Sequence, residues 1–231
     1  MSDQPAFRSL DPIVRPSVAD QVFQELHKQI VWLTLPPGAR LSEVEVSKVL
    51  GVSRQPVRDA FYRLSQLGFL EIRPQRATRV SLISVDAVLQ ARFVRTALEV
   101  EIVRAACGSI SETWKKRLND NLAQQEDAVR KDDRNRFHQL DDAFHEMLCL
   151  LSDHAFAWQI IQESKAHLDR VRLLSLSFNQ QFTLEEHRGL VAALLEGDAD
   201  GAEKRMRDHL SRLYHEINRI RSENPDYFAE E

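Results

Sequence analysis

The pattern of apolar and polar positions between residues 42 and 82 predicts two short helices, a tight turn and a β-hairpin. Ser42 and Glu45 have the spacing of a capping box, so the first helix should begin there. Gly51 suits the turn, because a positive φ costs glycine no steric strain. Ser53 can cap the second helix. The buried side of this helix carries apolar residues at helical spacing, namely Val57, Phe61, Leu64 and Leu67.

The same pattern predicts the strands of the hairpin. Segments 69–73 and 78–82 alternate between apolar and polar residues, as two strands joined by the loop at 74–77 would. Helix, turn, helix and hairpin in this order are typical of a winged helix-turn-helix, in which the hairpin is the wing and the second helix enters the major groove of DNA.

One further helix should precede this motif. Apolar residues along one face predict a helix over 18–34, with Ser17 as its cap and Pro36-Pro37-Gly38 as its end. Residues 1–16 contain three prolines without periodicity and are expected to form a flexible arm. The winged helix-turn-helix DNA-binding domain is therefore predicted over residues 17–82.

After a short linker near Leu82–Val85, only helical periodicity is found. The spacing of apolar residues predicts six helices, over 85–107, 112–131, 133–152, 154–176, 182–196 and 198–222. Several of the breaks between them end in a residue that can cap the next helix. We therefore expect a mainly α protein in which an N-terminal winged helix-turn-helix precedes a C-terminal all-α helical bundle over 84–222, followed by a frayed tail over 223–231.

The charges are distributed unevenly between these two parts. The formal net charge is −4, which taken alone argues against a nucleic-acid binder. Residues 1–80 hold 11 Lys and Arg against 8 Asp and Glu, a net of +3, whereas residues 81–231 hold 20 against 27, a net of −7. A basic head on an acidic body suits a protein of which only the head contacts DNA.

Cysteine content and hydropathy indicate the compartment. Cys107 and Cys149 give no disulfide framework, which fits a reducing cytosol. No apolar run reaches the ~18 residues of a membrane span, and the N-terminus has no signal-peptide core. We expect a cytoplasmic protein with no membrane partner.

The residues expected to read DNA lie on the early, outward side of the second helix: Ser53, Arg54, Gln55 and Arg58. Arginine can pair bidentately with guanine, and glutamine with adenine. Residues 54–79 hold six arginines, which would supply the attraction to phosphate, and Gln75 and Arg76 are assigned to DNA binding at the wing tip. The alternative is a small α+β domain with a solvated basic face.

A second group of polar residues stands on apolar stripes of the helical domain. Asp141 and His145 follow Phe137 at steps of four and share its face of the helix, while His187 and His209 are flanked by apolar residues at +3 and +4 spacing. Such residues need partners once buried. A shared divalent cation would satisfy all four, although a core imidazole bonded to a carbonyl is the alternative for each histidine. The neighbouring row, His138, Asp142 and Glu146, is polar and should face water.

The N-terminal stretch resembles the DNA-binding domain of GntR-family transcription regulators. The matching residues are Pro36-Pro37-Gly38, Leu41 and the run GVSRQPVRDAFYRLSQLGFLEIRP. Two positions depart from the family pattern: Val44 stands where many members have a DNA-contacting arginine, and Ala77 stands at the wing tip where glycine is usual.

The helical part resembles the FCD branch of the same family, at FHQLDDAFHEML, EEHRGLVAALLEGD and MRDHL. Six helices point to its VanR-like subgroup. The resemblance implies a metal at Asp141, His145, His187 and His209, which would be zinc, nickel or manganese. It also implies an arginine that holds a carboxylate ligand near the metal. Arg95 is the first candidate and Arg172 the second, with a surface ion pair to Glu99 as the alternative role of Arg95.

These features favour a ligand-responsive transcription regulator, most simply a repressor. A homodimer would bind a roughly palindromic operator, and a small carboxylic acid would bind the metal-containing helical domain. Two alternatives remain open. One is a metal-dependent enzyme, for which the sequence offers no general base beside the metal. The other is a constitutive DNA-binding protein whose helical domain only dimerises.

Overall fold

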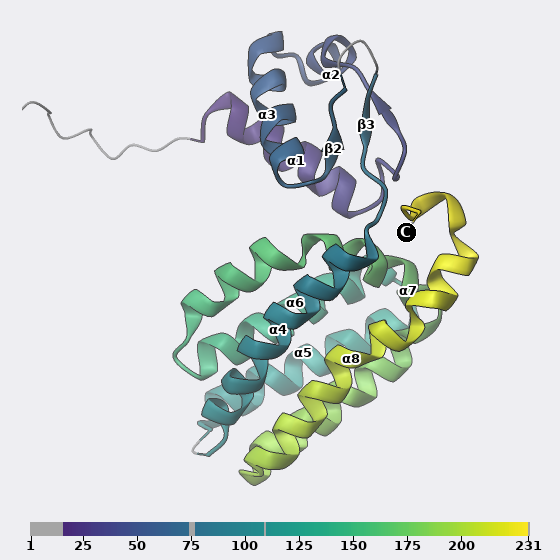
Figure 1. Ribbon diagram of the computed structural model, residues 1–231. Coiled ribbons are helices and arrows are strands. Elements are labelled where there is room, and N and C mark those ends of the chain that lie inside the picture. The colour runs from purple at the N-terminus through teal and green to yellow at the C-terminus, as the bar shows by residue number, and fades with distance from the viewer. Residues whose placement is uncertain (1–15, 74–76, 109, 231) are drawn as a thin grey trace, which may run out of the picture. The chain divides into compact units, whose positions relative to one another are not determined.

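The computed structural model describes residues 16–73, 77–108 and 110–230, without the side chains of residues 177 and 178 (Figure 1). The chain forms two compact units. The first comprises the described residues up to 28 together with 40–79, and the second comprises 29–39 and 80 onward. The predicted arm lies outside the described residues apart from Pro16.

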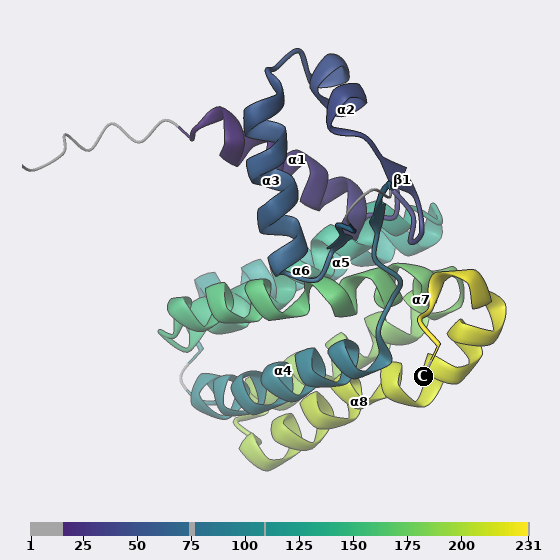
Figure 2. The same cartoon turned by 45° about the horizontal axis from the view of Figure 1, so that its top comes forward.

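The first unit is a winged helix-turn-helix, as predicted. Its elements in chain order are α1 (Val18–Val31), β1 (Arg40–Leu41), α2 (Glu43–Leu50), α3 (Arg54–Gln66), β2 (Leu70–Glu71) and β3 (Thr78–Val80). Figure 2 shows α3 crossing α1. Of the four residues predicted on the buried side of α3, Val57, Phe61 and Leu64 are at most 1% exposed. The prediction was wrong for Leu67, which is 49% exposed, because α3 ends at Gln66 and Leu67 lies beyond its last turn. The opposite face of α3 is left to the solvent.

The sheet of this unit contains one strand that the sequence pattern did not predict. Strand β1 pairs antiparallel with β3, with Arg40 opposite Arg79 and Leu41 opposite Thr78, and the strand order is β1-β3-β2. Two residues are too few to show an alternating pattern, so β1 is identified only by its partner. The loop predicted at 74–77 lies outside the described residues except for Ala77.

The turn between α2 and α3 forms as predicted, but its serine caps do not. Gly51 adopts the left-handed conformation, with φ of 66°. Ser42 and Ser53 occupy the N-cap positions, yet neither side chain accepts a hydrogen bond from the helix. At α2 the main chain begins the helix, because Val46 N–H donates to the carbonyl of Ser42 over 2.9 Å.

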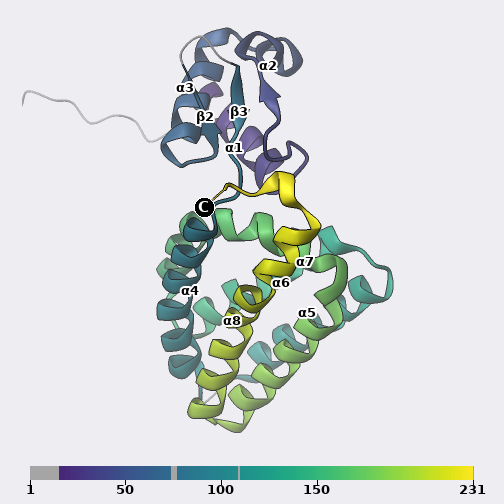
Figure 3. The same cartoon turned by 45° about the vertical axis from the view of Figure 1, so that its right-hand side comes forward.

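The second unit is an all-helical bundle. Its α-helices are α4 (Val85–Ala106), α5 (Glu112–Arg130), α6 (Arg134–Leu151), α7 (Ala155–Glu196) and α8 (Ala199–Glu223). Helices α4, α7 and α8 pack against one another, and α5 packs against α6 and α7 (Figure 3). Ser84, Asp133 and Asp198 cap α4, α6 and α8 with their side chains, as their positions at the predicted breaks indicated.

Helix α7 replaces two of the six predicted helices. The predicted break at Phe178–Asn179 is bridged by continuous helix, so the described residues contain five α-helices in this domain. The ribbon of α7 nevertheless bends strongly along its length, and its two limbs run in different directions (Figures 1 and 3). The bundle therefore still presents about six helical segments, and the predicted fold class is confirmed.

The C-terminal tail is ordered, contrary to the frayed tail that was predicted. Residues Pro225–Tyr227 form a short 3-10 helix, and Phe228 is only 4% exposed. Phe228 pairs in parallel with Ile83. Burial of this aromatic ring outweighs the polar composition of the segment. Among the described residues, no helix is long and apolar enough to cross a membrane.

Candidate functional site

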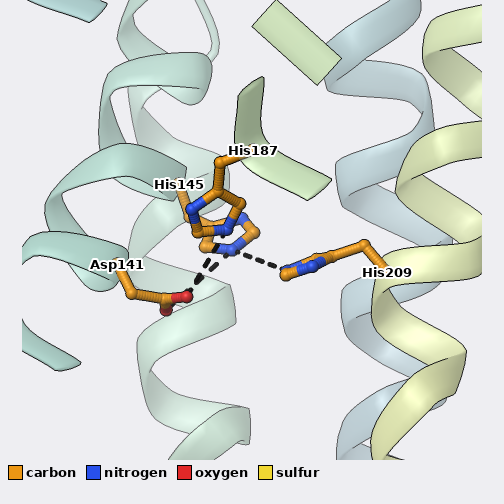
Figure 4. A group of neighbouring side chains, drawn as sticks. All are labelled: Asp141, His145, His187 and His209. Carbon is orange, nitrogen blue, oxygen red and sulfur yellow. Dashed lines mark hydrogen bonds and ion pairs between the residues drawn. The ribbon is translucent and has the colours of Figure 1, made fainter. Parts of the chain in front are cut away.

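Four side chains from three helices converge on one point inside the helical bundle (Figure 4). Asp141 and His145 lie one turn apart on α6, His187 lies on the second limb of α7, and His209 lies on α8. One nitrogen or oxygen atom from each residue lies within 4.8 Å of those of the others. The structure thus brings together the four residues that were grouped from sequence.

The three imidazoles direct their Nε2 atoms toward this point. Nε2 of His145 and Nε2 of His209 are 3.3 Å apart, and Nε2 of His187 lies 3.5 Å from Asp141 Oδ1. Nε2 of His145 lies 4.0 Å from Asp141 Oδ2. Three nitrogen atoms and one carboxylate oxygen around a common centre are a ligand set for a transition-metal ion.

The opposite nitrogen of each ring meets a side-chain oxygen. Nδ1 of His145 lies 2.5 Å from Glu99 Oε2. Nδ1 of His187 lies 2.8 Å from Gln125 Oε1, and Nδ1 of His209 lies 3.0 Å from Glu186 Oε2. Oxygen partners of this kind favour the proton on Nδ1 and leave the Nε2 lone pair free for a metal. His187 does bond to a carbonyl oxygen, that of the Gln125 side-chain amide, as the alternative assumed, whereas His145 and His209 lie against carboxylates.

Burial keeps the rings of His187 and His209 in the neutral form that a metal requires. It lowers the pKa of His187 well below the usual value and lowers the pKa of His209 to about 4. Burial alone would raise the pKa of Glu99, but the neighbouring Arg95 and His145 outweigh this effect and lower it. At neutral pH the rings of His187 and His209 are therefore neutral, and the carboxylate of Glu99 is ionised.

Two atoms at the centre of the cluster lack a hydrogen-bond partner, and this allows us to ask whether a cation fits the site. Asp141 Oδ1 and His187 Nε2 are buried and have no hydrogen-bond partner among the described residues. Buried polar groups in folded proteins are almost always paired. A divalent cation would pair with both at once, so the residues present fit a metal ion.

Gln125 and Glu186 were not anticipated from the sequence. Gln125 lies on α5, where it is fully buried and donates to Asn121 Oδ1 over 2.7 Å. Glu186 precedes His187 in the chain, yet it serves His209 on another helix. No spacing along the chain identifies either residue, because each meets its histidine only through helix packing.

The two candidate arginines lie beside this centre. Arg95 donates to Glu99 over 2.6 Å, and this pair is almost completely buried rather than on the surface as the alternative role assumed. Arg172 contacts the carboxylate of Asp141 and lies 3.3 Å from Asp169. Helical spacing showed the pairing of Arg95 with Glu99, but the packing of α4 against the other helices decides that the pair is buried.

Both arginines line a cavity of about 50 Å³. Asp141 and His209 form part of the same wall, so the metal-ligand cluster opens into this space. The remaining lining includes the apolar side chains of Leu168, Leu176, Leu210 and Leu213. A space that holds a few water molecules beside cationic groups suits a small polar molecule.

A neighbouring cluster of His138, Asp142 and Asp169 does not resemble a metal site. Lys165 donates to both oxygens of Asp142, over 2.8 and 3.0 Å, and contacts Asp169. Its ammonium group thus supplies the positive charge. His138 is only 3% exposed and Asp142 is half-buried, so the expectation that their row faces water was wrong for these two residues, whereas Glu146 is exposed as predicted. Packing of α6 against α7 covers this part of the row.

The predicted DNA-reading residues of α3 lie on its exposed side. Ser53, Arg54, Gln55 and Arg58 are all exposed. The guanidinium groups of Arg54 and Arg58 lie 3.4 and 3.3 Å from the carboxylate of Glu43. Exposed ion pairs of this kind are weak and can exchange for phosphate. Gln75 and Arg76 lie outside the described residues.

An exposed basic helix on a winged helix-turn-helix, joined to a helical domain with its own ligand set, defines a DNA-binding transcription regulator. Residues 18–80 match the bacterial regulatory proteins of the gntR family, and residues 90–212 match the FCD domain. The chain is 38% identical over 216 residues to the HTH-type transcriptional repressor RspR of Escherichia coli K12, covering 93% of this chain and 95% of RspR. The chain therefore belongs to the GntR family and carries an FCD domain.

Other comparisons agree with this assignment. Over 211 residues the chain is 36% identical to an HTH-type transcriptional regulator of Streptomyces ambofaciens, covering 90% of this chain and 88% of that protein. The structure of E. coli McbR/YncC is similar with a TM-score of 0.72, at 22% identity, and covers 90% of this chain and 99% of McbR. A GntR regulator from Rhodococcus sp. RHA1 gives a TM-score of 0.70 at 22% identity, over 87% and 97% of the two chains. At this identity both structures support the fold alone.

Replacing His187 should remove bound metal. His187→Ala deletes one ligand of the four, so elemental analysis of protein purified without chelator should show most of the metal lost relative to wild type. His215→Ala is the matched control, because His215 lies on α8 but is exposed. Equal loss in both variants, or full retention in His187→Ala, would contradict the site.

Replacing the exposed arginines of α3 should weaken operator binding. Arg54→Ala and Arg58→Ala should each cost about 1–3 kcal/mol if they read bases, whereas a phosphate contact would lower the salt dependence instead. Titrations of operator DNA at two salt concentrations distinguish these cases. Arg207→Ala, an exposed arginine of α8, is the control. Unchanged affinity in both α3 variants would show that this face does not contact DNA.

Proposed function

We propose that this protein is a metal-containing, ligand-responsive repressor whose ligand is a small carboxylic acid. The observation that carries the proposal is the shared cavity: Arg95, Arg172 and two members of the His and Asp cluster line one space. Because the chain is a DNA-binding regulator, a ligand at this position is best understood as the signal that changes operator binding.

In this proposal Asp141, His145, His187 and His209 hold the metal. Three neutral imidazoles and one carboxylate leave a divalent ion with a net charge near +1, and the bound ion supplies an electrophilic site for an anionic oxygen. Ligand type favours zinc, nickel or manganese. Glu99, Gln125 and Glu186 orient the three rings.

The charges around the cavity favour an anion over a neutral ligand. Arg172 stands beside Asp141, and Arg95 lies on the adjacent wall. The planar guanidinium group matches the two oxygens of a carboxylate. Arg95 is paired with Glu99, and Arg172 is paired with Asp141 and Asp169. The side chain of Arg172 is 13% exposed against 3% for Arg95, so Arg172 is the arginine more accessible to a ligand, while Arg95 adds positive potential.

Two further features of the proposal are that the protein binds DNA as a two-fold dimer and that it represses transcription. A single winged head reads few base pairs, and a two-fold dimer matches a roughly palindromic operator. RspR, a relative over nearly its whole length, is named a repressor. The bundle has about six helical segments when the two limbs of α7 are taken separately, which supports membership of the VanR-like subgroup. A ligand can alter DNA affinity only by as much as it prefers one arrangement of the protein over another.

Carboxylates should stabilise the metal-loaded protein, and their neutral amides should not. We expect butanoate to raise the melting temperature and to change operator affinity, whereas butanamide, of nearly equal size, should do neither. Arg172→Gln should reduce both effects while keeping metal. A scan of melting temperature with a gel-shift titration measures them. A butanamide effect equal to that of butanoate would rule out the proposed ligand class. Stabilisation without any change in operator affinity would favour a constitutive DNA-binding protein.

A further inference from the structure

The part of the cavity away from the metal-ligand cluster is lined by one cationic and one anionic side chain. Arg92 of α4 and Glu216 of α8 both line the cavity. Nε of Arg92 is buried without a hydrogen-bond partner, and the guanidinium lies 5.2 Å from the centre of the Tyr214 ring. Glu216 accepts a hydrogen bond from the amide of Asn179. Within the described part of the chain, neither residue forms an ion pair of its own.

Helix geometry separates this pair from the metal-ligand cluster. His209 and Glu216 are seven residues apart on α8, or about 10 Å along the axis at 1.5 Å per residue. Leu210 and Leu213 line the cavity between them. A ligand that reaches both ends would need a carbon chain between two polar groups, and the leucines would contact that chain.

The charges of Arg92 and Glu216 determine which polar group the ligand should carry at the end away from its carboxylate. A hydroxyl group both accepts and donates, so it can satisfy Arg92 and Glu216 together. A second carboxylate would suit Arg92 but meet the charge of Glu216, and an ammonium group would suit Glu216 but meet Arg92. A methyl group would leave both polar side chains unpaired, which costs binding free energy. We propose that Arg92 and Glu216 form a subsite for the hydroxyl group of a hydroxylated carboxylic acid.

This inference rests on the proposed carboxylate site and can be tested separately from it. Suitable probes are butanoate, 4-hydroxybutanoate and succinate, with the corresponding hexanoate, 6-hydroxyhexanoate and adipate for a longer reach. Calorimetric titration of full-length, metal-loaded protein should show one of the hydroxy acids binding about tenfold tighter than its parent acid. Arg92→Gln and Glu216→Gln should remove that preference while leaving butanoate or hexanoate binding unchanged. Arg207→Gln is the surface control.

The outcomes of these titrations distinguish failure of the carboxylate site from failure of the hydroxyl subsite. If none of the six acids binds, the carboxylate proposal itself fails. If parent and hydroxy acids bind equally, or if a dicarboxylate binds tightest, the hydroxyl subsite is wrong although the carboxylate site stands. Loss of butanoate and hexanoate binding in Arg92→Gln would also overturn it, because Arg92 would then hold the carboxylate.

A separate observation concerns residues 81–83, through which the chain enters the helical bundle. Ile83 N–H donates to the carbonyl of Tyr227 over 2.8 Å, and Ala229 N–H donates to the carbonyl of Ile83 over 3.0 Å. Arg170 of α7 donates to the carbonyl of Ser81 over 2.6 Å. Residues 225–229 and Arg170 thus hold this entry segment from two sides, and they are called the clasp below.

The clasp is unusual because it contains a buried guanidinium group. Arg170 is 0% exposed, and its Nε and Nη1 atoms have no partner among the described residues. An incompletely paired buried charge is costly, so this contact with Ser81 is poised to be exchanged for another. Ile83 and Phe228 are 1% and 4% exposed and lie in one apolar cluster with residues of α4, α7 and α8.

The helices that build the cavity also carry the clasp. Arg170 and Arg172 are two residues apart on α7, so they point to nearly opposite faces, one to the entry segment and the other to the cavity. Helix α8 carries His209 and continues through Asn224 into the segment that pairs with Ile83. We infer that the clasp transmits the state of the cavity to the entry segment and, through the continuous chain, to the DNA-binding unit.

Variants of the clasp should separate ligand binding from the DNA response. In full-length protein, Phe228→Ala and Arg170→Met should keep metal and operator binding, but the ratio of operator affinities with and without zinc should fall toward one. Phe156→Ala is the matched control, because Phe156 on α7 is 70% exposed. A full zinc response in both clasp variants would overturn the inference.

Amide hydrogen exchange provides a second measurement that does not depend on DNA. If zinc alone leaves the operator affinity of the wild type unchanged, exchange at Ile83 and Ala229 decides the question. Slower exchange in zinc-loaded than in metal-free protein, lost in Arg170→Met, supports transmission to the entry segment. Identical exchange in both states rejects it.

Discussion

The helical domain depends on one requirement, that charged and polar groups in its interior must compensate one another. Glu99 illustrates this best, because it pairs with Arg95 on one side and approaches His145 on the other. Removing Arg95 would leave the carboxylate of Glu99 buried without a counter-charge, which is strongly destabilising. The same requirement explains why each imidazole has an oxygen behind it. The ligand set is therefore held in place by its surroundings before any ion binds, and the cost of burying it is limited because burial keeps His187 and His209 neutral.

Helix α7 links the separate polar clusters of this interior. Its first limb supplies Lys165, Arg170 and Arg172, and its second limb supplies His187 and Glu186. Because the two limbs run in different directions, one element reaches the acidic cluster near α6, the cavity and the segment that enters the bundle. A small displacement of such a helix would shift the residues at all three places. This makes α7 and α8 the elements through which a ligand can act on the rest of the chain.

The DNA-binding unit differs from the helical domain in keeping its charged groups on the surface. Its core is apolar, its basic residues are exposed on one face of α3, and its ion pairs with Glu43 are weak enough to be displaced by phosphate. The excess of negative charge belongs to the helical domain, whereas residues 1–80 carry a net charge of +3. Net charge was thus less informative than its distribution along the chain.

The sequence alone determined those features that rest on local interactions. The apolar face of α3 up to Leu64, the glycine turn at Gly51 and the caps at Ser84, Asp133 and Asp198 all depend on residues within one or two turns, and they were predicted correctly. The grouping of Asp141, His145, His187 and His209 was accessible for a related reason. Each is a polar residue on an apolar stripe, and that stripe can be read from periodicity.

Only the tertiary structure decided which residues stand behind these ligands and which segments pair at a distance. Gln125, Glu186, strand β1 and the burial of Phe228 have no signature along the chain, because their partners are brought near by helix packing or by a strand on the other side of the fold. The continuity of α7 was missed because a polar interruption resembles a break until packing supports both limbs. His138 was misjudged for the same physical reason: a polar row faces water only where no other helix covers it.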